Sequence, residues 1–584
     1  MNRWSPALLA LLALPSVLSA QQAAGWPPQR PVPNPIEVPP GFTRAVQRGT
    51  RTTTGQPGPR YWQQWANYRI RASIDPAAKT VTGGESIVYH NRSPDTLQTL
   101  NVQLILNIHR PDAVRDEENE ATGGVNLTRV AARGQTLGQI TQRGQPGFAV
   151  QGTNLVIRPA APLLPGDSIR LELDWNFRIP QSGASARMGY DADNVFFLAY
   201  WYPQMAVYDD VVGWQTDPFL GTAEFYMGYG SYEYTIEAPA GWVVMGTGTL
   251  ANAEQALPAP VLARWRRAMQ SDTTVHVLTA ADFGPGKATA NGTNGRVSWT
   301  FRADSVRDVA FSVTRESLWD AARTPVGDRN GDGRPDYTTI NAFYRPNATL
   351  WRSAVRYGQQ SITHHSHFTG VMYPYPHMTA VEGLAGGMEY PMMTMIGAFE
   401  GSTDTTLYSV TSHELGHMWF PMIIGVDERR YGWMDEGTTD FNENEARNAY
   451  YHLSAPGAHL EEQQQYLGGV RRGLDVRELT WTDYITPPQA GGFATYRKPA
   501  TILQTLRNLI GEQAFMRGYQ AYARAWAFRH PKPYDFFNAF NTAAGRDLGW
   551  FWSAWYDHPW SLDQAVQAVL SNEQLTTITI ADRG

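Results

Sequence analysis

The segment 411–420, which reads Thr-Ser-His-Glu-Leu-Gly-His-Met-Trp-Phe, constrains the fold of this 584-residue chain more than any other. In a helix, residues four apart lie on one face, so the imidazoles of His413 and His417 can bind one ion, whereas Glu414 is turned about 100° from His413. The chain has to keep this segment helical and bring further ligands to its histidine face. We therefore expect a metal site with a carboxylate base beside it.

A third ligand is needed, because a catalytic zinc usually takes three protein ligands and leaves one position for water. Glu436 follows His417 after eighteen residues, at the start of a second predicted helix. Pro421 ends the first helix and allows the chain to fold back toward the ion. We predict that zinc is bound by His413, His417 and Glu436, with Glu414 as a base that is not a ligand.

Other polar residues near these helices have competing interpretations. Asp440 lies one helical turn after Glu436, where it can accept the second ring N–H of a ligating histidine. The alternative is a solvated helix carboxylate. His364, His365 and His367 form a cluster without a carboxylate at ligand spacing, so we interpret them as packing or surface histidines.

Residues 328–336 read Asp-Arg-Asn-Gly-Asp-Gly-Arg-Pro-Asp. Oxygen side chains at positions 1, 3, 5 and 9 and glycine at 6 match the start of an EF-hand loop, but position 12 is Thr339 rather than Glu. We predict a short structural calcium loop, and the alternative is a polar Asp-Gly turn. The possible calcium ligands are Asp328, Asn330, Asp332 and Asp336.

The first twenty residues are typical of a secretory signal peptide, with Arg3, an apolar run over 7–14 and small residues up to Ala20. An uncleaved anchor is the alternative, but the apolar run is shorter than the roughly 20 residues that cross a bilayer. We predict cleavage after Ala20 and export to a bacterial periplasm or exterior. No later segment reads as a membrane span, and the absence of cysteine excludes disulfides.

The remaining sequence predicts two main domains. Residues 21–60 are rich in proline and predict a flexible leader. Alternating apolar runs over 61–315 predict a mainly antiparallel β domain, and no internal period supports the alternatives of a propeller or tandem sandwiches. Helical periodicity over 304–322 and 350–364 places the domain boundary near 315. The net charge of −6, without basic clusters, argues against a nucleic acid partner.

Three elements together resemble the M1 family of zinc metallopeptidases. Residues 413–420 and Glu436 match the HExxH-x18-E signature, with Trp419 two residues past the second histidine. Residues 386–390, Gly-Gly-Met-Glu-Tyr, resemble the family's G-x-M-E-N exopeptidase motif. Tyr496, in Tyr-Arg-Lys, resembles the Tyr-x-Lys element that carries the catalytic tyrosine.

The resemblance covers about 60 to 560 and implies an α+β multidomain protein. A saddle-like, mainly antiparallel β domain would precede a thermolysin-like, mostly helical zinc catalytic domain over 316–560. Tyr496 would stabilise the oxyanion, and Glu389 would bind the free α-amine of a peptide substrate. Glu224 is a candidate for the β-domain residue that assists in amine binding. The implied substrate-binding residues are Glu389, Gly386, Gly387 and Met388.

The sequence also departs from the family pattern. Tyr390 replaces the motif's Asn, and Phe-Pro-Met at 420–422 replaces Phe-Gly-Asn. The tail, 561–584, shows one expected strand at 575–580 in place of a C-terminal helical domain, which suggests a clipped chain or a small cap.

Three functional hypotheses follow from these observations. The first is a secreted M1-type zinc aminopeptidase that hydrolyses peptides. The second is an M1-like hydrolase that accepts other substrates, such as longer peptides or an epoxide. The third is a peptide-binding module that has lost turnover, against which Glu414 and Tyr496 argue. The sequence leaves open the preferred first residue of the substrate and the oligomeric state.

Overall fold

The computed structural model describes residues 35–559 and 564–582, so the predicted signal segment, 1–20, lies outside the described residues. The two described stretches belong to separate units, and each is considered by itself. Within them, no helix has both the length and the apolar character that crossing a membrane requires.

The predicted N-terminal β region is built on an eight-stranded sheet with the order β16-β18-β14-β1-β2-β8-β4-β5. In β1 the buried side chains alternate with more exposed ones, which gives the sheet one core face. The β1–β14 pair is parallel, and the other pairs are antiparallel. The strands are β1 (Trp65–Asp75), β2 (Thr80–His90), β4 (Asn126–Ala132), β5 (Gln135–Thr136), β8 (Ser168–Arg178), β14 (Gly230–Pro239), β16 (Thr249–Leu250) and β18 (Arg296–Val306).

Three smaller sheets and three α-helices, together with short 3-10 helices, complete the described part of this region. One sheet has the order β15-β19-β10-β9, another β11-β3-β7-β6, and the third pairs β12 with β13. Their strands are β3 (Leu100–Gln103), β6 (Gly147–Gln151), β7 (Asn154–Arg158), β9 (Gly189–Asp191), β10 (Val195–Leu198), β11 (Gln204–Met205), β12 (Tyr208–Asp209), β13 (Gly213–Trp214), β15 (Val243–Gly246) and β19 (Phe311–Thr314). The helices are α1 (Pro40–Arg48), α2 (Ala253–Ala256) and α3 (Ala259–Ala268).

A six-stranded mixed sheet, β17-β20-β21-β22-β24-β23, precedes the helices that carry the site. Its strands are β17 (Val275–Leu278), β20 (Leu318–Gly327), β21 (Asp336–Tyr344), β22 (His377–Glu382), β23 (Gly387–Tyr390) and β24 (Met393–Ile396). β23 lies at the edge of the sheet and pairs only with β24 among the described strands. The sheet therefore leaves one side of the 386–390 motif open.

The helix predicted over 304–322 is wrong, because this segment contains the end of β18, all of β19 and the start of β20. Pairing of β20 with β17 and β21 decides its conformation, since tertiary context overrides a helical apolar spacing. The sheet also joins β17, which precedes the predicted domain boundary near 315, to β20, which follows it.

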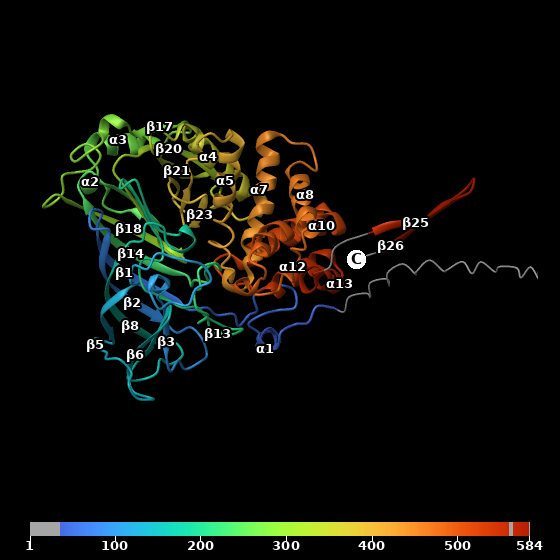
Figure 1. Ribbon diagram of the computed structural model, residues 1–584, viewed down its shortest axis with the longest axis horizontal. Coiled ribbons are helices and arrows are strands. Elements are labelled where there is room, and N and C mark those ends of the chain that lie inside the picture. The colour runs from blue at the N-terminus through green and yellow to red at the C-terminus, as the bar shows by residue number, and fades with distance from the viewer. Residues whose placement is uncertain (1–34, 560–563, 583–584) are drawn as a thin grey trace, which may run out of the picture. The chain divides into compact units, whose positions relative to one another are not determined.

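The C-terminal part of the main unit is mostly helical, and Figure 1 shows its orange and red helices together on one side of the blue and green strands. The predicted α+β order, a β-rich region followed by a mostly helical one, is confirmed. The helices are α4 (Ala354–Thr369), α5 (Asp404–Gly416), α6 (Glu428–Tyr431), α7 (Glu436–Tyr451), α8 (Ala458–Arg471), α9 (Gln489–Gly492), α10 (Lys498–Ile510), α11 (Glu512–Trp526), α12 (Pro533–Ala544) and α13 (Gly549–Trp552).

The segment expected to be a flexible leader is packed where the structure describes it. α1 begins at Pro40, because the fixed φ of proline suits the first turn of a helix, and Phe42 is buried against the body. Arg51 is fully buried and pairs with Asp210 and Asp535. Residues 35–60 therefore belong to the main unit.

The described tail is a hairpin rather than the lone strand expected at 575–580. β25 (Gln564–Ser571) pairs antiparallel with β26 (Thr576–Asp582). The first strand escapes detection because Gln and Ala dilute its apolar alternation, and its side chains are mostly exposed.

Candidate active site

Helix α5 and the residue that directly follows it place the two histidines on one face. It begins after Thr403, whose hydroxyl accepts the backbone N–H of Thr406 at 3.2 Å and so caps the helix. His417 directly follows the last residue of α5 and keeps helical backbone angles. The Nε2 atoms of His413 and His417 are 3.1 Å apart. The local sequence thus forms the helix that the spacing of the histidines requires.

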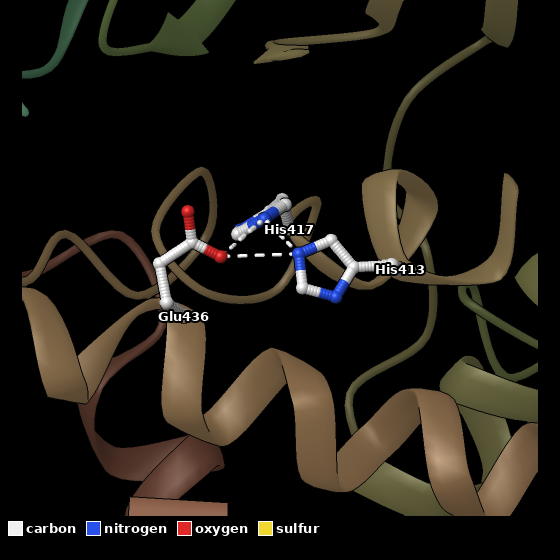
Figure 2. Close-up of side chains that lie close together, drawn as sticks. All are labelled: His413, His417 and Glu436. Carbon is white, nitrogen blue, oxygen red and sulfur yellow. Dashed lines mark hydrogen bonds and ion pairs between the residues drawn. The ribbon is translucent and has the colours of Figure 1, made fainter. Parts of the chain in front are cut away.

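Glu436, the first residue of α7, completes a triangle of potential ligand atoms. Its Oε2 lies 3.0 Å from Nε2 of His413 and 3.2 Å from Nε2 of His417, as Figure 2 shows. Ligand atoms about 2.1 Å from a tetrahedral zinc are separated from one another by about 3.4 Å. The three side chains therefore have the chemistry and nearly the spacing of a zinc site, and they can hold a metal ion together.

The second nitrogen of each imidazole faces a carboxylate. His413 Nδ1 lies 3.1 Å from Asp440 Oδ1, and His417 Nδ1 lies 2.7 Å from Asp435 Oδ1. Such partners fix the ring orientation and direct the Nε2 lone pair toward the ion. The helical spacing in the sequence had predicted that Asp440 lies near the ligands. Asp435 was missed, although its position directly before Glu436 was a usable signal.

Glu414 projects from α5 beside the triangle, and its side chain is buried with Oε2 free of hydrogen-bond partners among the described residues. Burial raises its pKa to about 8, and His413 and His417 oppose this rise. The edge strand β23 passes close to this carboxylate. A Cβ atom at Gly387 would lie well inside contact distance of Glu414 Oε1, so only glycine permits this approach.

Tyr496 reaches the other side of the triangle from a π-helical segment, Phe493–Arg497. Its hydroxyl donates to Glu436 Oε1 at 2.5 Å. Burial and the neighbouring Glu436 carboxylate raise the pKa of the phenol well above its ordinary value, so it stays protonated at neutral pH. The structure therefore offers a protonated O–H donor next to the ligand triangle.

A group of carboxylates extends the site beyond Glu414. Glu389, on β23, is buried, and one of its oxygens lies within 4.8 Å of ligand atoms of Glu414 and His417. Glu224 approaches Glu389 from the β region, and both contact the guanidinium of Arg187. The sequence pointed to Glu224 only weakly and did not point to Arg187.

The remaining residues of the 386–390 motif shape the edge strand. Gly386 directly precedes β23, and its carbonyl accepts the N–H of Gly397 at 3.4 Å. The carbonyl of Met388 accepts the hydroxyl of Thr394 at 2.6 Å. These bonds tie β23 to β24 and hold Glu389 in place.

The calcium loop predicted over 328–336 receives no support. Asp328 Oδ1 accepts the N–H of Gly331 at 2.6 Å, and its Oδ2 accepts that of Gly333 at 2.8 Å. The oxygens close backbone turns, as the alternative of a polar Asp-Gly turn implies. Among the described residues, no metal-sized group of side chains includes the predicted ligands Asp328, Asn330, Asp332 and Asp336.

The histidine cluster on α4 lies behind the site. His365 is fully buried, and its Nε2 is 3.0 Å from the carbonyl oxygen of Ser412 on α5. Its contact with the neighbouring helix agrees with a packing role. His367 is exposed.

Comparisons with known proteins agree with this geometry. Residues 354–555 match the Peptidase family M1 domain. These residues form an M1 peptidase domain. The resemblance predicted from the motifs is confirmed.

The similar proteins are distant in sequence. Mitochondrial aminopeptidase 2 of Saccharomyces cerevisiae is 24% identical over 207 residues, which are 32% of this chain and 21% of the yeast protein. Aminopeptidase N of Streptomyces lividans is 26% identical over 157 residues, 25% of this chain and 18% of that protein. The chain thus matches about a fifth of the length of these relatives.

Solved structures show the same fold over a larger share of the chain. The M1 zinc metallopeptidase from Deinococcus radiodurans superposes with a TM-score of 0.55 and 14% identity. The superposition covers 85% of this chain and 94% of that one. Both the β-rich region and the helical region therefore take part in the shared fold.

Proposed function

We propose that this protein is a zinc-dependent peptidase that removes residues from the N-terminus of peptides. The observation that carries the proposal is the triangle of His413, His417 and Glu436, with Glu414 and Tyr496 on its two sides. The M1 peptidase domain over 354–555 supports the same class of reaction.

The three proposed protein ligands leave one coordination position of a tetrahedral zinc for water or the substrate. When bound, zinc polarises the scissile carbonyl and lowers the pKa of its water from about 15.7 to about 7. The carboxylate of Glu414 takes the proton of the attacking water and passes it to the leaving amine nitrogen. Its buried position suits this exchange, because a carboxyl with a raised pKa both accepts and releases a proton near neutral pH.

Tyr496 stabilises charge that develops during the reaction. Its hydroxyl donates to Glu436 Oε1 beside the triangle, and in the proposed reaction it would donate instead to the substrate carbonyl oxygen. Donation to that oxygen lowers the energy of the transition state, because the oxygen becomes negative only as the water attacks. The phenol is suited to this task since it does not ionise at neutral pH.

Glu389 and Glu224 supply the selection for a free N-terminus. Glu389 lies close to Glu414, and Glu224 lies close to Glu389, so an α-ammonium bound between Glu389 and Glu224 would place the first peptide bond near the catalytic groups. A blocked N-terminus lacks the positive charge that the carboxylates require.

Location and domain organisation complete the proposal. The signal-like sequence over 1–20 supports export to the periplasm or exterior of a bacterium, where peptides are the substrates. The division into a β domain, 61–315, and a catalytic domain, 316–560, stays a prediction, and the pairing of β17 with β20 crosses its boundary. Gly386, Gly387 and Met388 are the proposed substrate-binding residues of the edge strand.

The test uses alanyl and leucyl aminomethylcoumarin with a free or an acetylated N-terminus. We expect zinc-dependent cleavage of the free forms only, and almost none by Glu414→Gln with unchanged zinc content. Equal cleavage of the acetylated substrates would refute the aminopeptidase and favour an M1-like hydrolase of other substrates. Activity that survives Glu414→Gln would refute the proposed site.

A further inference from the structure

Arg187 is a buried guanidinium inside the carboxylate group of the site. It follows the 3-10 helix Ala184–Ala186, and only 5% of its side chain is exposed. Its Nη1 donates to Glu389 Oε1 at 3.3 Å, and its Nη2 donates to Glu224 Oε1. The guanidinium carbon lies 5.2 Å from the ring centroid of Phe225, which covers one face. A fixed cation therefore joins the two carboxylates that would bind a substrate amine.

Tyr390 holds the backbone of Arg187. Its hydroxyl donates to the carbonyl oxygen of Arg187 at 2.9 Å, and its ring is fully buried between Phe197 and Tyr200. The asparagine of the family motif is too short to reach this carbonyl from the same position. The departure at Tyr390 and the cation at Arg187 are thus two parts of one arrangement.

The charges and free oxygens of this group indicate what it can bind. Glu428 and Asp435 belong to the same carboxylate group, but they pair with Arg307 and His417. With both of their carboxyls ionised, Glu224 and Glu389 together with Arg187 carry one net negative charge, which a single ammonium neutralises. Glu224 Oε2 is buried and has no hydrogen-bond partner among the described residues, so it can still accept a proton donor. Glu389 also lies close to Glu414 and His417. The remaining negative charge therefore faces the catalytic groups.

Removing the guanidinium would change this arrangement. Glu224 and Glu389 would then repel each other in a buried place, and their side chains would separate or share a proton. Either outcome removes the orientation that an ammonium needs, because its N–H groups require acceptors at fixed positions.

We propose that Arg187, held by Tyr390, is the positioning residue of the amine site. It keeps Glu224 and Glu389 in one orientation and leaves one net negative charge for a single primary α-ammonium. The substrate class is therefore peptides with a free N-terminal amine, and this inference rests on the proposed function above.

The kinetic test compares the parent with Arg187→Met, Arg187→Lys and Tyr390→Phe on alanyl-aminomethylcoumarin. We expect KM to rise about tenfold for Arg187→Met, which corresponds to about 1.4 kcal/mol of binding energy. The kcat should change little, because the interaction is made with the substrate and kept in the transition state. Arg187→Lys should restore part of the affinity, and Tyr390→Phe should give a smaller rise in KM.

Arg345→Met is the matched control. Arg345 also joins two carboxylates, Glu382 and Asp191, but none of these three belongs to the site. Loss of this guanidinium removes a similar ion pair and should leave KM unchanged. An equal rise in KM for Arg345→Met would show a general loss of structure and overturn the proposal.

A binding test separates this inference from the reaction itself. Zinc-loaded Glu414→Gln, with and without Arg187→Met, is titrated with L-leucinamide and N-acetyl-L-leucinamide by ligand-detected NMR. We expect binding of leucinamide alone, weakened about tenfold by Arg187→Met. If the parent cleaves no peptide but this pattern appears, the proposed reaction fails and the inference stands. If cleavage occurs while Arg187→Met and Tyr390→Phe leave KM unchanged and Arg187→Met leaves Kd unchanged, the inference is overturned.

Discussion

Replacing Tyr496 by phenylalanine tests the proposed chemistry most directly, because it removes one hydroxyl and almost no volume. Loss of a single donor to a developing oxyanion costs about 2.7 to 4 kcal/mol, or about 10² to 10³ in kcat. The same hydroxyl bonds at 2.5 Å to Oε1 of Glu436, the proposed ligand whose Oε2 faces the two histidines, so its loss also leaves Oε1 without this donor. A net hydrogen bond to a charged group contributes about 1.5 to 3 kcal/mol, which gives an upper limit for any effect on zinc affinity.

The assay has to separate these two effects. Steady-state kinetics on alanyl-aminomethylcoumarin would give kcat and KM, and elemental analysis would give zinc per chain for parent and Tyr496→Phe. We expect full zinc occupancy at saturating metal and a kcat reduced by about 10² to 10³ with KM nearly unchanged. A kcat within threefold of the parent at full occupancy would refute the donor role. If the loss of zinc accounts for all of the lost activity, Tyr496 only holds Glu436 in place and does not act as the oxyanion donor.

Two further predictions concern groups outside the proposed catalytic set. Asp435→Asn should weaken zinc binding by about 10- to 100-fold, because His417 loses its charged partner at 2.7 Å, and competition with a coloured chelator measures the change. An unchanged Kd would contradict that role. Burial lowers the pKa of His530 to about 4. In the unfolded chain its pKa is near 6.5, so between these two pH values His530 is protonated in the unfolded state and neutral in the native state. His530 should therefore account for up to about 3 kcal/mol of the stability lost as the pH drops from about 6.5 to 4. Burial also lowers the pKa of His364, His365 and His377, so His530→Gln should show a pH dependence that is smaller by this share, not abolished, in urea titrations.

The proximity of His413, His417 and Glu436 was predictable because local rules place these residues. His413 and His417 share a face through helical spacing alone, and Glu436 begins the next long helix, so few arrangements could bring it to the ion. Asp440 followed from the same periodicity. Alternation of apolar residues likewise predicted β1, in which every second side chain is buried.

The errors arose where contacts distant in sequence decide the structure. The segment 304–322 has apolar residues at helical spacing, yet its strands form because β17 and β21 supply backbone partners for β20. The proline-rich start of the chain packs because Arg51 finds Asp210 and Asp535, which lie 159 and 484 residues away. The local sequence of neither segment indicates these distant partners.

The proposed amine site shows why sequence motifs predict metal ligands more easily than they predict the residues that select the substrate. The two proposed histidine ligands lie four residues apart on one short stretch of chain, whereas Arg187 meets Glu389 across 202 residues and Glu224 across 37. In the sequence alone, Tyr390 is a departure from the family motif without an explanation. With its hydroxyl on the Arg187 carbonyl, the same residue holds a cation that joins Glu224 and Glu389. A departure from a family motif is therefore best interpreted by asking which distant residue the new side chain reaches.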